Sequence, residues 1–220
     1  MKLLLTSAGI SNPSIHNALL GLLGKPIAES SALCISTASY ALSNGPILAW
    51  QFISGHDDCP MCELGWKSLG VLELTALPSL GKQHWLPWVQ ETDVLLVNGG
   101  DPLYLSYWMQ QSGLAHLLPS LPAVYVGLSA GSMVMAPRIG EHFVGWTPPT
   151  GGDNTLGLVD FALFPHLDHE MLPYNSMPHA EKWAAGMHMP SYAMDDQTAV
   201  KVVDGVVEVI SEGHWKRFAP

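Results

Sequence analysis

The sequence contains few positively charged residues. Lysine and arginine together number 9, against 19 aspartates and glutamates, and the formal net charge is −10 at pH 7. Arginine occurs only at positions 138 and 217. Proteins that bind nucleic acid usually present a cluster of basic side chains to the phosphates. We therefore expect no nucleic-acid partner.

The sequence also lacks a long uninterrupted apolar segment. Hydrophobic residues make up 48% of the chain. Glycine, proline or a charged residue nevertheless interrupts every apolar run before it reaches the roughly 20 residues of a transmembrane helix. The first apolar run, residues 3–5, is too short for the apolar region of a signal peptide. These features predict a cytoplasmic protein with no membrane partner.

Cysteine is scarce, with three residues at positions 34, 59 and 62. Three thiols cannot all pair within one chain, so no disulfide framework is indicated. Cys59 and Cys62 have the CxxC spacing of zinc and redox sites, but no second ligand pair at similar spacing accompanies them. We interpret this segment as a loop with two ordinary thiols, and metal binding or redox chemistry is the alternative. We predict neither a metal nor a cofactor.

Strand-like and helix-like segments alternate along the chain. Continuous apolar runs predict strands that are buried on both faces. The strands are expected at residues 2–6, 32–36, 69–75, 94–97, 124–128 and 159–164. Helices are expected at residues 14–23, 83–91, from 102 onward, after 129, and at 177–187. Ser14 is the expected cap of the first helix and Gly24 its stop signal.

The C-terminal part of the chain contains short strand-like segments at residues 191–194, 199–203, 206–210 and 214–218. The pair Asp204-Gly205 between two of them predicts a hairpin turn. The whole pattern indicates an α/β fold. We expect a mainly parallel, doubly wound sheet flanked by helices, with a small antiparallel C-terminal portion. A chain of 220 residues fits one domain, covering residues 1–220.

The segment Gly127-Leu-Ser-Ala-Gly131 follows an apolar strand and precedes a helix-like segment. A strand that enters a helix through a tight turn flanked by glycines raises its central side chain above the sheet, as in a nucleophile elbow. Ser129 is therefore the predicted nucleophile. A second glycine turn, Asn98-Gly-Gly-Asp-Pro102, follows the strand at 94–97. Both turns are expected at the carboxyl edge of the sheet, where sites form in doubly wound folds.

A serine nucleophile needs a base within hydrogen-bond reach and an acid that orients this base. His166 follows the strand predicted at 159–164, so we expect it at the same sheet edge as Ser129. Asp196 is the preferred acid. Glu141, in the long loop at residues 138–155, is its competitor, followed by Asp153.

Backbone N–H groups of Gly100 and Ala130 are the expected donors to the oxyanion of a tetrahedral intermediate. Gly99 and Asp101 border the same crevice. Arg138 is placed to receive a substrate carboxylate or, alternatively, to pair with Glu141. In the same long loop, Trp146 is the one tryptophan that we expect near a ligand.

These motifs together resemble the peptidase S51 family, which includes dipeptidase E and cyanophycinase. The resemblance rests on Val97-Asn-Gly-Gly-Asp-Pro-Leu-Tyr-Leu105, Val126-Gly-Leu-Ser-Ala-Gly-Ser132 and Phe164-Pro-His166, and more loosely on Tyr192-Ala-Met-Asp-Asp-Gln-Thr-Ala199. It implies a fold similar to class I glutamine amidotransferases, with serine in place of their cysteine at the elbow, so glutaminase chemistry is not implied.

The resemblance implies Ser129 as nucleophile, His166 as base, and Gly100 with Ala130 as the oxyanion hole. The third catalytic residue differs within the family. Cyanophycinase-like members, which this chain resembles, have an acidic residue at the position of Asp196. Dipeptidase E, which the chain also resembles, has its acid in the loop after the elbow, the region of Glu141. Asp101-Pro102 departs from the Asn-Thr or similar pair that is common in the family, and this leaves the substrate preference open.

The function expected from the sequence is a serine peptidase that cleaves small peptides through an acyl-enzyme, with dipeptides that begin with an acidic residue as one substrate class. An α/β-hydrolase esterase is a first alternative, with Ser129, Asp195 or Asp196, and His214 in that order. A non-catalytic binding protein that keeps the fold is the second. The sequence leaves open whether the chain forms a homodimer.

Overall fold

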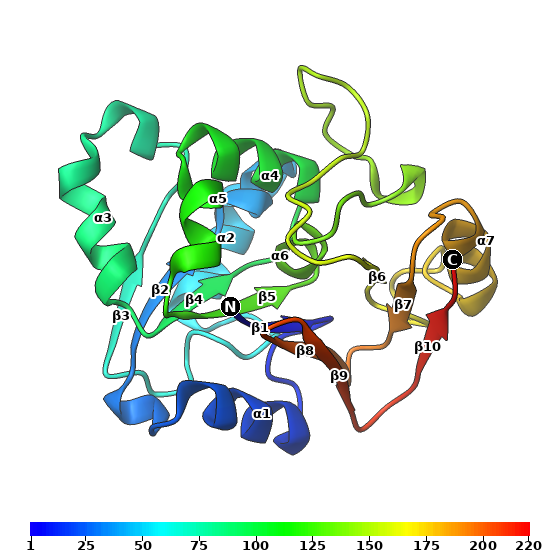
Figure 1. Ribbon diagram of the computed structural model, residues 1–220, viewed down its shortest axis with the longest axis horizontal. Coiled ribbons are helices and arrows are strands. Elements are labelled where there is room, and N and C mark those ends of the chain that lie inside the picture. The colour runs from blue at the N-terminus through cyan, green and yellow to red at the C-terminus, as the bar shows by residue number, and fades with distance from the viewer.

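The computed structural model describes residues 1–220 and contains two β-sheets. The main sheet has seven strands in the order β3-β2-β4-β5-β1-β8-β9, and the small sheet has three in the order β10-β7-β6 (Figure 1). The main strands are β1 (Lys2–Thr6), β2 (Ser31–Ile35), β3 (Ser68–Val71), β4 (Val94–Val97), β5 (Val124–Leu128), β8 (Thr198–Val203) and β9 (Val206–Ser211). The small sheet is built from β6 (Ala162–Phe164), β7 (Ser191–Met194) and β10 (Trp215–Phe218).

Seven α-helices accompany the sheets. They are α1 (Pro13–Leu23), α2 (Gly45–Ser54), α3 (Lys82–Glu91), α4 (Pro102–Gln111), α5 (Leu114–Leu117), α6 (Ala130–Met133) and α7 (Met177–Ala185). Short 3-10 turns are η1 (Ile27–Glu29), η2 (Thr37–Ala41), η3 (Leu77–Ser79), η4 (Leu118–Ser120) and η5 (Glu141–Phe143). None of these helices combines the length and the apolar character that a membrane crossing requires.

The centre of the main sheet is parallel and buried on both faces. Strands β2, β4, β5 and β1 pair in parallel, and all residues of β4 and β5 are buried. Helix α1 covers one face, while α3, α4 and α5 cover the other (Figure 1). This arrangement explains why these strands read as continuous apolar runs. The α/β fold with a mainly parallel sheet flanked by helices, predicted from the sequence, is confirmed.

The C-terminal edge of the main sheet is antiparallel. Strand β8 pairs antiparallel with β1 and with β9. Val203 and Val206 face each other across a two-residue turn, and Asp204 and Gly205 both have positive φ, at 49° and 84°. Two central residues with positive φ are the requirement of a type I′ turn. The predicted Asp204-Gly205 hairpin is thus confirmed.

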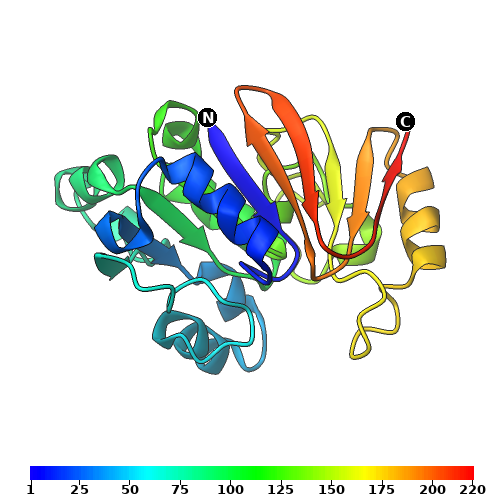
Figure 2. The same ribbon diagram turned by 90° about the horizontal axis from the view of Figure 1, so that it is seen from below.

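Strand β6 lies in the small sheet, which corrects one expectation. It pairs in parallel with β7, and β7 pairs antiparallel with β10. In Figure 2 this sheet stands beside the β8–β9 hairpin, with α7 on its outer side. Because β8 occupies the free edge of β1, no place remains there for β6. His166 therefore does not follow a strand of the main sheet, as its sequence position had led us to expect.

Two local expectations also change. The cap of α1 is Asn12, whose side chain accepts a hydrogen bond from Ile15 N–H, and not Ser14. Gly24 ends this helix in the left-handed conformation, as expected. Helix α2 lies in a segment for which we expected no element. The helix after Ser129 has only four residues. The single-domain assignment stays a prediction.

Candidate active site

Ser129 occupies a strained turn between β5 and α6. Its backbone has φ 48° and ψ −108°, a conformation that is rare outside glycine. The turn needs glycine on both sides because the backbone packs closely there. A Cβ on Gly127 would lie 2.4 Å from the Gly131 carbonyl oxygen, and one on Gly131 would lie 2.3 Å from the Val97 carbonyl oxygen. The geometry is that of a nucleophile elbow.

The second glycine turn lies directly beside this elbow. A Cβ on Gly99 would lie 3.4 Å from Ser129 Cβ, so the two turns are in contact. Gly100 has φ 134° and packs against the backbone of Ala38. No hydrogen bond uses the Gly100 N–H. Ala130 begins α6, and the N–H of a first helical residue has no partner within its helix. Both expected oxyanion donors are thus unpaired beside Ser129.

His166 follows β6 with a positive φ of 55° and makes two contacts that fix its position. Its backbone N–H donates to Ser7 Oγ at 2.7 Å, and its ring Nδ1 lies 2.7 Å from Asp196 Oδ1. The side chain is 19% exposed. Because Nδ1 is occupied by the carboxylate, Nε2 is the ring nitrogen available for proton transfer. No hydrogen bond joins His166 to Ser129 directly.

Asp196 is held as an ionised acid beside His166. Its Oδ1 accepts a hydrogen bond from Ser7 Oγ at 2.9 Å, and its Oδ2 lies 3.6 Å from His169 Nε2. Burial alone would raise the pKa of this carboxyl group. This effect of burial is outweighed by the hydrogen bond and charge of His166, the hydrogen bond of the Ser7 hydroxyl and the charge of His169. The pKa of Asp196 therefore lies below the ordinary value of 3.8. A carboxylate in contact with Nδ1 orients the imidazole and stabilises its protonated form.

Ser7 is a site residue that the sequence analysis missed. It is fully buried directly after β1, where its hydroxyl contacts both His166 and Asp196. The preceding residue, Thr6, accepts a hydrogen bond from Ser129 N–H through its carbonyl oxygen. Ser129 and His166, which follow strands of different sheets, are therefore both bound to the carboxyl end of β1. The position of Ser7 at the end of a predicted strand was the signal that could have revealed it.

The other two candidate acids lie away from His166. Glu141 is on η5 and lines a separate pocket together with Arg138. Asp153 accepts hydrogen bonds from Arg138 Nε at 2.9 Å and from Gly140 N–H at 2.8 Å, so it closes the long loop on itself. Among the three acids, only Asp196 is in hydrogen-bond contact with the base. Arg138 pairs with Asp153 and not with Glu141.

The carboxylate of Asp101 is occupied by backbone donors. Its Oδ1 accepts from the N–H groups of Leu103 and Tyr104, which caps α4. Its Oδ2 accepts from Trp146 N–H at 2.6 Å. The side chain thus ties the long loop to the helix that follows the second glycine turn. The Trp146 ring packs edge-on against Tyr104.

His214 and the cysteines make no hydrogen bond to Ser129, His166 or Asp196. His214 contacts Asp168 at 3.1 Å and Asp195 at 3.0 Å, and neither partner touches Ser129. Cys59 lies in a loop, where burial and nearby carboxylates raise its pKa to about 12. Its thiol is therefore protonated at neutral pH. The structure brings no three histidine, cysteine, aspartate or glutamate side chains into a group that could hold a metal ion.

Comparison with known proteins gives a consistent result. Residues 3–210 match the model of peptidase family S51. A crystal structure of a candidate peptidase E protein from Listeria monocytogenes EGD-e superposes with a TM-score of 0.64 at 18% identity, covering 96% of this chain and 98% of that one. A peptidase from an acI-B1 Actinobacterium also gives a TM-score of 0.64 at 18% identity, with 99% and 93% coverage. No curated protein sequence matches the chain.

Proposed function

The chain belongs to peptidase family S51, and on this premise we propose that it is a serine peptidase with Ser129 as nucleophile, His166 as base and Asp196 as the orienting acid. The observation that carries the proposal is the convergence at the end of β1. Ser129, on its strained turn, is bound there to Thr6, and the His166–Asp196 pair is bound there to Ser7. Family membership supports peptidase activity, and the site residues support the serine type.

The proposed reaction begins when His166 Nε2 removes the proton from Ser129 Oγ, which attacks the carbonyl carbon of the scissile peptide bond. The N–H groups of Gly100 and Ala130 donate to the oxyanion that forms. When the intermediate collapses, the protonated His166 gives its proton to the leaving amine, and Ser129 retains the acyl group. Water, activated by the same base, then hydrolyses the acyl-enzyme. Apart from this water, every group named in the proposed reaction belongs to the substrate or to this chain.

For the substrate we propose small peptides, and dipeptides with an N-terminal acidic residue as the class to test first. The long loop at residues 138–155 supports a small substrate because Asp101 ties it to the helix after the second glycine turn and Asp153 holds the loop closed on itself. Equal rates of cleavage for a folded protein and for dipeptides would contradict this part of the proposal. A small acyl group is also compatible with the close contact between the two glycine turns.

Labelling with a fluorophosphonate probe tests the serine mechanism. We expect the wild-type protein to react and to hydrolyse members of a dipeptide library, and Ser129→Ala to do neither. His166→Ala should abolish labelling, whereas His214→Ala should retain most of it because His214 contacts only Asp168 and Asp195. Loss of labelling with His214→Ala alone would favour the esterase arrangement. An unreactive Ser129 in the folded wild-type protein would instead favour a non-catalytic binding protein.

A further inference from the structure

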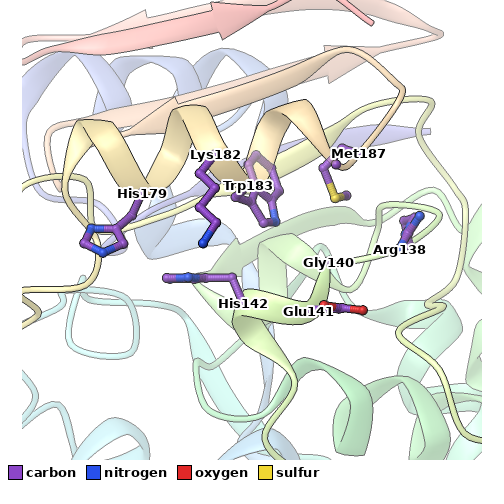
Figure 3. A pocket seen from close by; sticks show the side chains of 9 residues that line it. Arg138, Gly140, Glu141, His142, His179, Lys182, Trp183 and Met187 are labelled. Carbon is purple, nitrogen blue, oxygen red and sulfur yellow. The ribbon is translucent and has the colours of Figure 1, made fainter.

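A pocket outside the catalytic residues lies between residues 138–142 and α7 (Figure 3). Its volume is about 530 Å³, and the side chains that define it here are Arg138, Glu141, His142, His179, Lys182 and Trp183. We refer to it as the loop–helix pocket. None of its side chains has a part in the mechanism proposed above.

The walls of the pocket are firmly built. Trp183, on α7, donates its ring N–H to the carbonyl oxygen of Ile139 at 2.7 Å. Gly140 approaches the same ring so closely that a Cβ there would lie 2.5 Å from Trp183 Nε1. Asp153 binds both Arg138 and Gly140 from the other side. The Trp183 hydrogen bond and the close approach of Gly140 therefore join the helix to the loop, while Asp153 fixes the shape of the loop itself.

The lining of the pocket is rich in potential positive charge. Lys182, Arg138, His142 and His179 line it together with the carboxylate of Glu141, and Arg138 is also paired through Nε with Asp153, which is not part of the lining. In Figure 3 the side chains of Lys182, His142 and His179 converge on the same space. Lys182 has no ion-pair partner, whereas Lys216 on β10 pairs with Glu181. In a chain with a formal net charge of −10, such a concentration of basic groups favours an anionic ligand.

The pocket is connected to the catalytic base by a short chain of hydrogen bonds. His142 Nε2 lies 3.5 Å from Asn175 Oδ1, and Asn175 Nδ2 donates to the Pro165 carbonyl oxygen at 3.1 Å. Pro165 directly precedes His166. A ligand in the pocket would thus lie beside the segment that positions the base.

We propose that the loop–helix pocket binds the carboxylate group of a peptide or a free amino acid, with Lys182 and Arg138 as its cationic partners. The indole ring of Trp183 beside these charges suits a small organic acid with an apolar side chain, since it offers an apolar wall. The two sources of this carboxylate are the C-terminus of the uncleaved substrate and a free amino acid. The first source rests on the proposed peptidase function, and the second does not.

Binding to the catalytically inactive Ser129→Ala protein tests the pocket without hydrolysis. Aspartyl-leucine, its C-terminal amide and free leucine are titrated by calorimetry. We expect at least one of the two free acids to bind, and Lys182→Gln to weaken its binding by about tenfold, because hydrogen bonds to charged groups are the stronger ones. Lys216→Gln, which removes the same charge outside the pocket, is the matched control and should bind like its parent. Binding that Lys182→Gln leaves unchanged, or no binding of either acid, would overturn the proposal.

Kinetics of the active enzyme then separate the two sources. If the substrate carboxylate occupies the pocket, Lys182→Gln raises KM for aspartyl-leucine by about tenfold and leaves KM for the amide unchanged. If a free amino acid is the ligand, the two substrates have similar KM values, and leucine alters hydrolysis of the amide only when Lys182 is present. Absence of hydrolysis in the wild type would refute the proposed peptidase function, while the binding result would still decide the pocket.

Discussion

The acid that orients His166 can be identified by substitution at single residues. We expect Asp196→Asn to lower kcat/KM by about 10³- to 10⁴-fold, because an amide stabilises the wrong tautomer of the imidazole and cannot balance its charge. Glu141→Gln should have a much smaller effect, since Glu141 does not contact His166. Steady-state kinetics on one dipeptide measures both variants. An equal loss with Glu141→Gln would move the acid to the long loop.

The Ser7 hydroxyl should act as a positioning group. Ser7→Ala leaves the His166 N–H without its acceptor and removes one donor to Asp196. A small displacement of a catalytic group can lower the rate by about 100-fold, so we expect kcat to fall by about 10- to 100-fold with little change in KM. Ser132→Ala is the matched control because Ser132 is also fully buried and donates only to the Thr6 carbonyl oxygen. Equal kcat losses in both variants would indicate a general packing effect.

The lowered pKa of Asp196 makes a prediction about stability in acid. Burial raises this pKa, but the contacts with His166, Ser7 and His169 lower it further than burial raises it. A carboxyl group whose pKa is lower in the folded than in the unfolded state stabilises the folded protein. This stabilisation is complete at pH values above the pKa of the group in the unfolded chain, about 3.9. This contribution is lost as the pH falls through the folded value. Urea unfolding from pH 6 to pH 3 should therefore show a smaller loss of stability in Asp196→Asn than in wild type. An identical loss would contradict this linkage.

At the scale of elements, the close contact between α6 and β4 depends on Gly131. A Cβ at this position would lie 2.3 Å from the Val97 carbonyl oxygen, so Gly131→Ala must displace the elbow from the sheet. We expect a destabilisation of about 1–3 kcal/mol, the usual cost of overpacking, together with loss of probe labelling at Ser129. Gly21→Ala is the control: nothing lies within 4 Å of its Cβ position on α1, and alanine there should stabilise by about 0.5–1 kcal/mol. Thermal unfolding of both variants checks this contrast.

The elements that were predicted well from the sequence are those marked by a contiguous pattern of a few residues. Strands β4 and β7 have the predicted bounds because each is a short run between turn residues. Helix α2 was missed since Ile47 and Trp50 are exposed on it and obscure the apolar periodicity. For α1, Pro13 was the overlooked signal. Proline suits a first helical position, which makes the residue before it, Asn12, the cap.

The same distinction applies to the site. Ser129 and the glycine turns could be found from the sequence because each motif is contiguous. The placement of His166 could not, because β6 pairs with β7, which follows only after α7. A periodic pattern identifies a strand but does not say which partner it pairs with. The end of a predicted strand pointed to the position of Ser7, but its contacts with His166 and Asp196 depend on that long-range pairing.

At the scale of the whole molecule, the proposed nucleophile and base belong to two different sheets. The sheets are joined near the site by the chain between β7 and β8. There, Asp195 accepts hydrogen bonds from Gln197 N–H and Thr198 Oγ1. His214, which enters β10, contacts Asp195 and also Asp168, two residues after His166. The geometry of the site therefore depends on how the small sheet docks on the main one.

This arrangement predicts that activity is lost before the main sheet unfolds. The small sheet has strands of three or four residues, and most of β10 is exposed, whereas β4 and β5 are fully buried. Elements with few buried contacts open at lower free energy than the core. In a urea titration we expect peptidase activity to disappear at a lower concentration than the far-UV circular dichroism signal. Amide hydrogen exchange should in parallel be faster in the exposed strand β10 than in β4 and β5. Coincident midpoints and uniform exchange would show instead that the two sheets unfold as one unit.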